Sequence, residues 1–171
     1  NSGPSGTGGS SLSQALRIAR ESEHTAKEGY GRDSFVVSIV RRSGQISRNG
    51  AKWSTEDRTF DTINSIKDLI RKMEALDFGS RSLRKLFGDD LILSSDEYLE
   101  KYIPYVLKKA GSIKKDGGSL ERGLKDYFRK MYDLEKRIEE DIKRNGDPSD
   151  ARKRAVDLLL VQDFLLRGDG K

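Results

Sequence analysis

The stretch RDSFVVSIVRRSG, residues 32–44, places the tightest constraint on how this chain can fold. Side chains from Phe35 to Val40 alternate between the two sides of an extended strand, and apolar residues occupy both sides. This pattern is typical of an interior strand that is covered on two faces. We therefore expect a strand that lies inside a sheet.

Partners for this strand are hard to find in the rest of the chain. The turn signals Ser43-Gly44 and Asn49-Gly50 surround a short segment, Gln45–Arg48, and predict a small hairpin closed by Ala51-Lys52-Trp53. A hairpin of this size is not a sheet with two buried faces. We therefore expect an upstream segment or another chain to supply the sheet partners.

The remaining pattern predicts helices. Apolar residues recur at helical spacing from Leu12 to about Gly29, and a capped helix start follows the strand at Ser54-Thr55. From residue 55 to residue 168 we expect a helical bundle, so that the fold class is mainly α. Its longest helix is expected to begin at Ser119, and its last helix to run from Pro148 to about Arg167.

Three finer features of the bundle are also predicted. Gly79 should end the helix that starts at Ser54-Thr55, and a short helix should follow from Ser80 to Phe87. Pro104 should kink or divide the helix that opens at Ser94-Ser95-Asp96-Glu97. The first 11 residues have the composition of a flexible Gly/Ser-rich linker, and residues 169–171 are read as a tail.

Composition excludes several kinds of site. The chain has no cysteine, so disulfides, thiolate nucleophiles and cysteine zinc sites are excluded, and His24 is the only histidine. The net charge of +5 favours acidic partners such as RNA or DNA, but it is a small excess of 33 basic over 28 acidic residues. No apolar run approaches the length of a membrane span, and no signal peptide is visible. We expect a cytoplasmic protein without a membrane partner.

A first basic cluster near the hairpin is a candidate RNA contact. Arg41, Arg42 and Lys52 would contact phosphates, and Trp53 would stack on a base. The alternative interpretation is a strand end with solvated arginines and a tryptophan that packs at the boundary between two domains.

A second basic cluster follows one of the predicted helices. Its members would neutralise phosphates and make RNA binding sensitive to salt. The alternative is that they complement the dipole at an ordinary helix end. The cluster comprises Lys108, Lys109, Lys114 and Lys115.

The sequence Gly88-Asp89-Asp90 resembles a metal-binding motif. In polymerase-like palms, paired carboxylates on a hairpin hold two Mg²⁺ ions. Here a helical segment precedes the motif, so we interpret it as a glycine that ends a helix, followed by acidic residues that cap the next turn.

We also interpret His24 as a surface residue. An aromatic stripe is interpreted as mostly core, and it comprises Tyr98, Tyr102, Tyr127, Phe128 and Tyr132.

Three stretches of the chain together resemble one known family. The segment LSQALRIARESEHTAKEGYGRDSFVVSIVRRSGQ at Leu12–Gln45, followed by GAKW at Gly50–Trp53, resembles the end of the second palm domain in the large subunit of type III CRISPR effector complexes, of the Cmr type. VDLLLVQDFLLRG at Val156–Gly168 is similar to the closing helix of that subunit. The spacing between the RSG and GAKW motifs is the most distinctive part, while the bundle between the stretches is only compatible.

The resemblance implies a fold and a place in a complex. Residues 12–54 would be the end of an α/β palm domain, which contributes a helix, a strand and a small hairpin, and residues 55–168 would be the helical bundle domain. The full subunit of that family cuts single-stranded DNA with an HD nuclease domain and makes cyclic oligoadenylate from ATP in its palm domains, which implies ATP and Mg for the full subunit. Its helical domain packs on the small helical subunit along the guide RNA and target RNA.

This chain departs from the family in the parts that carry chemistry. The HD pair and the Gly-Gly-Asp-Asp loop are absent from the sequence, and a Gly/Ser-rich linker stands where the family has a palm strand. We therefore expect no catalytic, cofactor-binding or metal-ligating residue in this chain, and a structural and RNA-proximal role. The alternatives are an independent helical nucleic-acid-binding protein that uses Lys108–Lys115, and a Mg²⁺-dependent enzyme built on Asp89 and Asp90.

Overall fold

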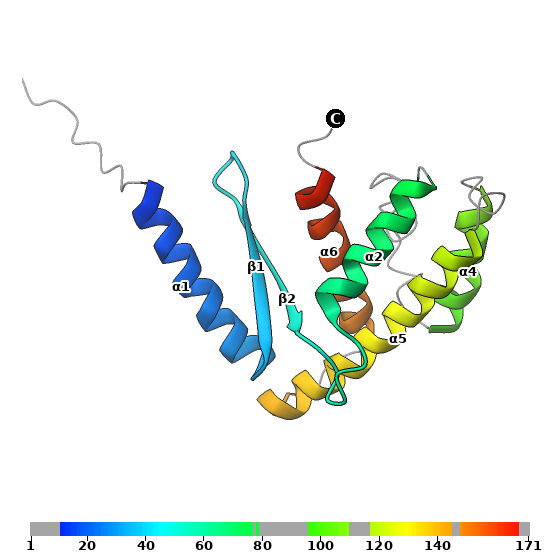
Figure 1. Ribbon diagram of the computed structural model, residues 1–171. Coiled ribbons are helices and arrows are strands. Elements are labelled where there is room, and N and C mark those ends of the chain that lie inside the picture. Colours follow the sequence, from blue (N-terminus) through cyan, green and yellow to red (C-terminus); the bar gives the residue numbers. More distant parts are fainter. Residues whose placement is uncertain (1–10, 77, 79–95, 110–116, 145–147, 168–171) are drawn as a thin grey trace, which may run out of the picture.

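The computed structural model describes residues 11–76, 78, 96–109, 117–144 and 148–167 (Figure 1). The described part is mainly helical, with one two-stranded antiparallel sheet, which confirms the predicted class at that level. The elements in chain order are α1 (Ser11–Tyr30), β1 (Ser34–Val40), β2 (Ile46–Lys52), α2 (Thr62–Ala75), α4 (Asp96–Lys109), α5 (Gly117–Ile142) and α6 (Pro148–Arg167).

The elements form two groups that meet at the base of the hairpin. Helix α1 and the β1–β2 hairpin stand on one side, and α2, α4, α5 and α6 gather on the other (Figure 1). Helix α5 runs under the molecule, and its C-terminal end reaches the base of α1 and the hairpin. One buried core joins the two groups, because Phe35 and Ala51 from the hairpin belong to the same cluster as the bundle side chains.

Helix α5 shows why the bundle forms. Its apolar residues recur every three or four positions, so they line one face of the helix. Every residue of this stripe is at most 3% exposed, and the stripe comprises Leu120, Leu124, Tyr127, Met131, Leu134 and Ile138. The buried Tyr127 hydroxyl donates to the Ala155 carbonyl oxygen at 2.7 Å, and burial raises the pKa of Tyr127. The apolar face of α5 is therefore buried in the core of the bundle.

The hairpin corrects the prediction that β1 finds no partner in its own chain. β1 pairs along its whole length with β2, from Ser34↔Lys52 to Val40↔Ile46. Asn49-Gly50 is not a turn but lies inside β2, because Gly50 is needed there for close packing: a Cβ at this position would lie 2.3 Å from the Phe35 carbonyl oxygen. The two-residue turn signal therefore marked a tight contact between strands.

The two faces of the hairpin are covered unequally. Helix α1 lies against one face, where the Ser22 and Ser38 hydroxyls are 2.6 Å apart, while Phe35 enters the bundle core from the other face. Coverage fades along β1, from Phe35 at 6% exposed to Val40 at 46%. The expectation of a strand buried on both faces thus holds only at its base.

The helix predicted to start at Ser54-Thr55 begins later, at Thr62. Asp61 is its N-cap and accepts a hydrogen bond from the Asn64 backbone N–H at 2.9 Å. The residues before it form a turn around Asp57, whose carboxylate accepts from the hydroxyls and backbone of neighbouring threonines. These hydrogen bonds lower the pKa of Asp57 to about 2. Local side-chain hydrogen bonds therefore displaced the helix start.

Other helix ends agree with the sequence to differing degrees. α6 has the predicted bounds, α5 begins two residues before Ser119, and α2 ends at Ala75 rather than at Gly79. α4 continues through Pro104, so that proline does not divide it. The short helix predicted at 80–87 lies outside the described residues. None of the described helices is long and apolar enough to span a membrane.

Candidate functional site

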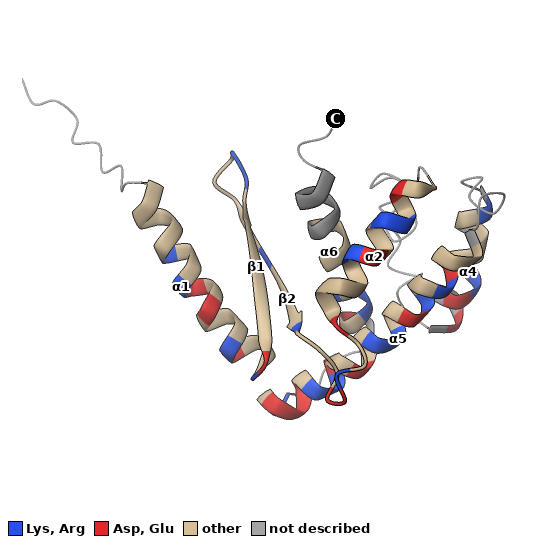
Figure 2. Cartoon of the chain, viewed as in Figure 1, with Lys and Arg blue, Asp and Glu red and all other residues tan. Residues whose placement is uncertain are grey.

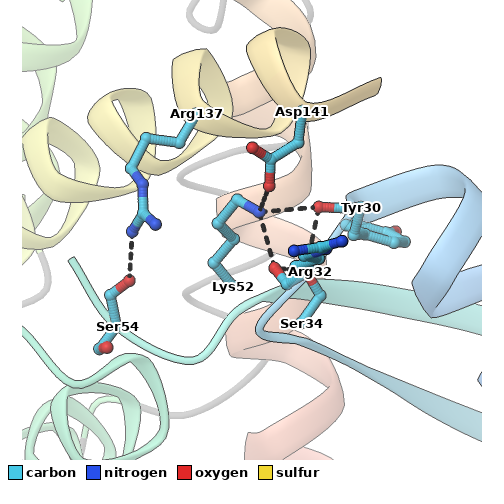
Figure 3. A network of polar contacts seen from close by, with 7 residues as sticks. All are labelled: Tyr30, Arg32, Ser34, Lys52, Ser54, Arg137 and Asp141. Atoms are coloured by element: carbon cyan, nitrogen blue, oxygen red, sulfur yellow. Dashed lines mark hydrogen bonds and ion pairs between the residues drawn. The ribbon is translucent and has the colours of Figure 1, made fainter. Parts of the chain in front are cut away.

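The side chain of Lys52, the last residue of β2, is completely buried. Its ammonium group donates to the carbonyl oxygens of Tyr30 at 3.1 Å and Arg32 at 2.8 Å, and it pairs with the Asp141 carboxylate of α5 (Figure 3). Three acceptors match the three protons of an ammonium group. The prediction that Lys52 contacts RNA is corrected by this geometry, because no part of the side chain reaches solvent. Its role is to hold the hairpin to α5.

The connection between α1 and β1 packs closely against the side chain of Asp141. Gly31 adopts a φ of +77°, and a Cβ there would lie 2.7 Å from the Asp141 Cβ. A second link lies beside it, where the Arg137 guanidinium of α5 donates to the Ser54 carbonyl oxygen at 3.1 Å (Figure 3). Helix α5 is therefore bonded to the hairpin base at two places, through Asp141 to Lys52 and through Arg137 to Ser54.

The ion pair makes stability depend on pH. The hydrogen bond from Lys52 is the largest influence on Asp141 and holds the pKa of its carboxyl below the usual 3.8. A depressed carboxyl pKa contributes stability above the unfolded-state pKa, and this contribution is lost as the pH falls through the folded-state pKa.

We expect the free energy of unfolding to decrease as the pH falls below about 4, and the variant Asp141→Asn to lose part of this dependence. Urea denaturation of both proteins at a series of pH values measures the two slopes. Equal slopes for wild type and variant would contradict the assignment.

A second ion pair, between Arg154 and the buried Glu135, fixes α6 to the same region. Both carboxylate oxygens of Glu135 accept from the Arg154 guanidinium, at 2.7 and 2.6 Å. Burial raises the pKa of Glu135, and the positive charge of Arg154 opposes that effect. Arg154 also lies 4.7 Å from the ring centroid of Tyr30, whose hydroxyl accepts from the Gly50 N–H at 3.1 Å. Tyr30 thus connects α1, β2 and α6.

Arg41 and Arg42 lie at the opposite end of the hairpin from these anchors. The turn that carries them is closed by two hydrogen bonds, Arg41 N–H to the Gln45 oxygen and Gly44 N–H to the Arg41 oxygen, both 2.9 Å. Both arginine side chains are exposed, and neither pairs with another side chain in the described part of the protein. They stand at the tip of the hairpin, where they are available to a phosphate (Figure 2).

Trp53 follows β2 at the domain boundary predicted from the sequence. Its ring packs on Phe35 with the ring centroids 4.6 Å apart, yet 51% of the residue is exposed. The packing agrees with the alternative interpretation, and the exposed part leaves room for stacking on a base. The prediction that Trp53 contacts a base stays a prediction.

The second basic cluster is only partly described. Lys108 is exposed near the end of α4, Lys109 is the last residue of that helix, and Lys114 and Lys115 lie outside the described residues. The hairpin tip and α4 lie at opposite sides of the view, with α6 and α2 between them (Figure 2). The structure therefore does not bring Lys108 together with Arg41 and Arg42.

The remaining candidates carry no site in the described structure. His24 is exposed on α1, as predicted, and Asp89 and Asp90 lie outside the described residues. The described residues contain no group of three or more histidine, aspartate or glutamate side chains placed to hold a metal ion.

The outer edge of β1 is the feature that the sequence revealed only in part. Hydrogen bonds from Trp53 N–H to the Asp33 oxygen and from Arg41 N–H to the Gln45 oxygen mark the two ends of the β1–β2 ladder. In an antiparallel pair only every second residue bonds to the partner strand, so the residues between them turn their N–H and C=O groups outward. These outward residues are Ser34, Val36, Ser38 and Val40. Among the described residues no strand pairs with this edge.

An apolar groove runs beside the open edge, between α1 and β1. Its α1 wall consists mainly of small and aliphatic side chains, among them Ala15, Ile18, Ala19 and Ala26. Three larger side chains on these two elements are exposed, Leu12 at 67% and Leu16 at 53% on α1 and Val40 at 46% at the end of β1. Helix α1 thus presents more apolar surface than its own hairpin covers.

Comparisons with known proteins do not identify a family: no family model, no curated protein and no solved structure matches this chain.

Proposed function

We propose that this chain is a structural and RNA-proximal module of a type III CRISPR effector complex, the C-terminal part of its large subunit. In this role its helices pack on the small helical subunit, and α1 and the hairpin support the palm domains. The residues that carry the resemblance, Leu12–Gln45 and Gly50–Trp53, cover almost all of α1, the whole of β1 and the end of β2, and these elements pack together, which supports treating them as one unit.

The observation that carries the proposal is the contrast between the two ends of the hairpin. At the base, Lys52 is buried and bonded to α1 and α5, while at the tip Arg41 and Arg42 are exposed and have no side-chain partner among the described residues. A firmly anchored arm with two cations at its end suits contact with a phosphate backbone, because little conformational freedom is lost on binding.

Replacing Arg41 and Arg42 together with alanine should weaken single-stranded RNA binding and make it less sensitive to salt. Each lost phosphate contact lowers the slope of log affinity against log salt by about 0.7, so we expect a decrease of about 1.4. Fluorescence anisotropy at several salt concentrations measures this slope.

The matched control removes two exposed cations from α2, Lys67 and Arg71. That variant has the same net charge as the hairpin variant, so it should bind RNA as wild type does if contact occurs at the hairpin tip. Equal losses in both variants would show that only net charge matters, and would contradict a contact at the tip.

Assembly tests the identity directly. We expect the chain to co-purify with the small helical subunit and to show no metal-dependent ATP turnover by itself. Synthesis of cyclic oligoadenylate by this chain alone would contradict the proposal. A stable monomer that binds RNA tightly with a steep salt dependence, and that ignores the small subunit, would favour the independent nucleic-acid-binding protein instead.

A further inference from the structure

We propose that two copies of this chain form a dimer by antiparallel pairing of the open edges of their β1 strands. The two hairpins would then form one four-stranded sheet with the order β2-β1-β1-β2. This inference goes beyond the proposed function and concerns the chain before it joins any other subunit. An exposed strand edge invites pairing, and natural proteins usually cover or protect it.

The geometry of the edge allows a self-complementary register. The outward residues of β1 are Ser34, Val36, Ser38 and Val40, and a two-fold axis beside Val37 places Ser34 opposite Val40 and Val36 opposite Ser38 of the second copy. In this register every outward residue of one strand faces an outward residue of the other. All outward N–H and C=O groups of both strands are therefore paired.

The other edge of the hairpin is not open in the same way. On β2, the Gly50 N–H donates to the Tyr30 hydroxyl at 3.1 Å, and the Lys52 carbonyl oxygen accepts from the Thr62 hydroxyl at 2.7 Å. The chain's own side chains thus bond to one outward backbone group at each of two β2 residues, Gly50 and Lys52. This difference selects β1 as the edge that pairs.

Charge complementarity supports a second copy as the partner. A hollow at the base of β1 is lined by the acidic Glu23, Glu28 and Asp33 and by the basic Lys27 and Arg32, while the charge of its fourth acidic residue, Asp141, is paired with Lys52. The antiparallel register brings the Arg41-Arg42 tip of one copy to this hollow of the other, with Asp33 opposite Arg41. Two such pairs form in each dimer.

The width of α1 supports a broader sheet. A helix with its side chains is about 10 Å wide, whereas neighbouring strands are about 4.8 Å apart, so two strands leave part of an overlying helix uncovered. The exposed Leu12 and Leu16 lie in the N-terminal half of α1, each about one helical turn before a residue that lines the groove, Ala15 or Ala19. The two-fold axis is perpendicular to the sheet, so the α1 helix of the second copy would lie on the same face, and the exposed apolar side chains of the two helices would approach each other above the joined strands.

A pair of proline variants at one rung of the hairpin tests the edge. Val40 and Ile46 are opposite each other, and both turn their backbone N–H outward, Val40 toward the open edge and Ile46 toward the far side. Sedimentation velocity of the purified chain at micromolar concentrations should show twice the 19.3 kDa mass for wild type and Ile46→Pro. Val40→Pro should weaken the dimer by about tenfold or more. A monomeric wild type would overturn the proposal, as would equal effects of the two prolines.

A charge exchange keeps the test informative if a proline variant does not fold. Asp33→Arg and Arg41→Asp should each weaken self-association, because each places like charges opposite each other. Mixing the two variants should restore a dimer, since both facing pairs are then Arg with Asp. The φ of Asp33 is +55°, so arginine there also costs some stability, but strain within one chain would not be relieved by mixing. Absence of recovery on mixing would overturn the proposed register.

Amide exchange gives an independent readout on the wild type. The Val36 and Ser38 amides point outward and should be protected only in the dimer, whereas the Val37 amide is bonded to β2 and protected in both states. Dilution below the dissociation constant should therefore accelerate exchange at the outward amides, Val36 and Ser38 among them, and leave exchange at Val37 unchanged. None of these measurements uses RNA or the small subunit, so their outcome does not depend on the proposed function.

Discussion

Replacing Lys52 with methionine should lower the free energy of unfolding by about 2–3 kcal/mol. Methionine fills a similar volume but leaves the Tyr30 and Arg32 carbonyl oxygens without their donor and Asp141 without its cation. The full penalty for breaking a buried ion pair does not apply, because 41% of the Asp141 side chain is exposed and water can solvate the charge. For a chain of this size the melting temperature should fall by about 5–10 °C, which calorimetry measures.

The matched control for this variant is Lys72→Met. Lys72 also pairs with an aspartate, Asp68 at 2.9 Å, but that pair lies on the surface of α2. Its loss should cost about 0.5 kcal/mol or less. If the two variants were equally stable, Lys52 would not be the anchor that the structure makes of it.

Replacing Gly50 with alanine should cost about 3 kcal/mol, because the new Cβ has no space. It would lie 2.3 Å from the Phe35 carbonyl oxygen and 2.8 Å from a Val36 methyl group, so the two strands would have to separate. A backbone atom cannot rotate out of the way as the end of a flexible side chain can. Urea denaturation should show a lower midpoint, and amide exchange should show faster opening of the hairpin than of α5.

Gly29→Ala is the control that separates this contact from a general effect of glycine. Gly29 lies in α1, and a Cβ there would meet nothing within 4 Å. Alanine is the better helix former, so this change should stabilise the protein by about 0.5–1 kcal/mol. A Gly50→Ala variant as stable as wild type would mean that the close approach of β1 and β2 does not exist in solution.

The helices show where interpretation of the sequence succeeded and where it failed. The α5 stripe and the bounds of α6 follow from helical spacing and from the Asp147-Pro148 start, which are local signals. The start of α2 did not follow from local signals, because Ser54, Thr55 and Asp61 all have the residue type of a cap and only Asp61 acts as one. Acceptable caps that lie several residues apart cannot be ranked without knowing which backbone is drawn into a turn.

In the candidate site, too, some residues could be placed from the sequence and others could not. Exposure of Arg41 and Arg42 was foreseeable from a turn between polar residues, and both are exposed in the structure. Lys52 has the same charge and lies in the same cluster of the sequence, yet it is buried. Its partner Asp141 lies 89 residues further along the chain, and no local pattern could have shown that pairing.

The amino-acid sequence by itself determined that the chain is mainly helical, that it contains a strongly apolar strand and that it carries an excess of positive charge, because spacing, capping and composition act over a few residues. Only the tertiary structure decided that β1 pairs with its own neighbour, that Gly50 is a contact rather than a turn, and that Lys52 is an anchor. Those outcomes depend on the distance between segments far apart in the chain, and chain folding sets that distance.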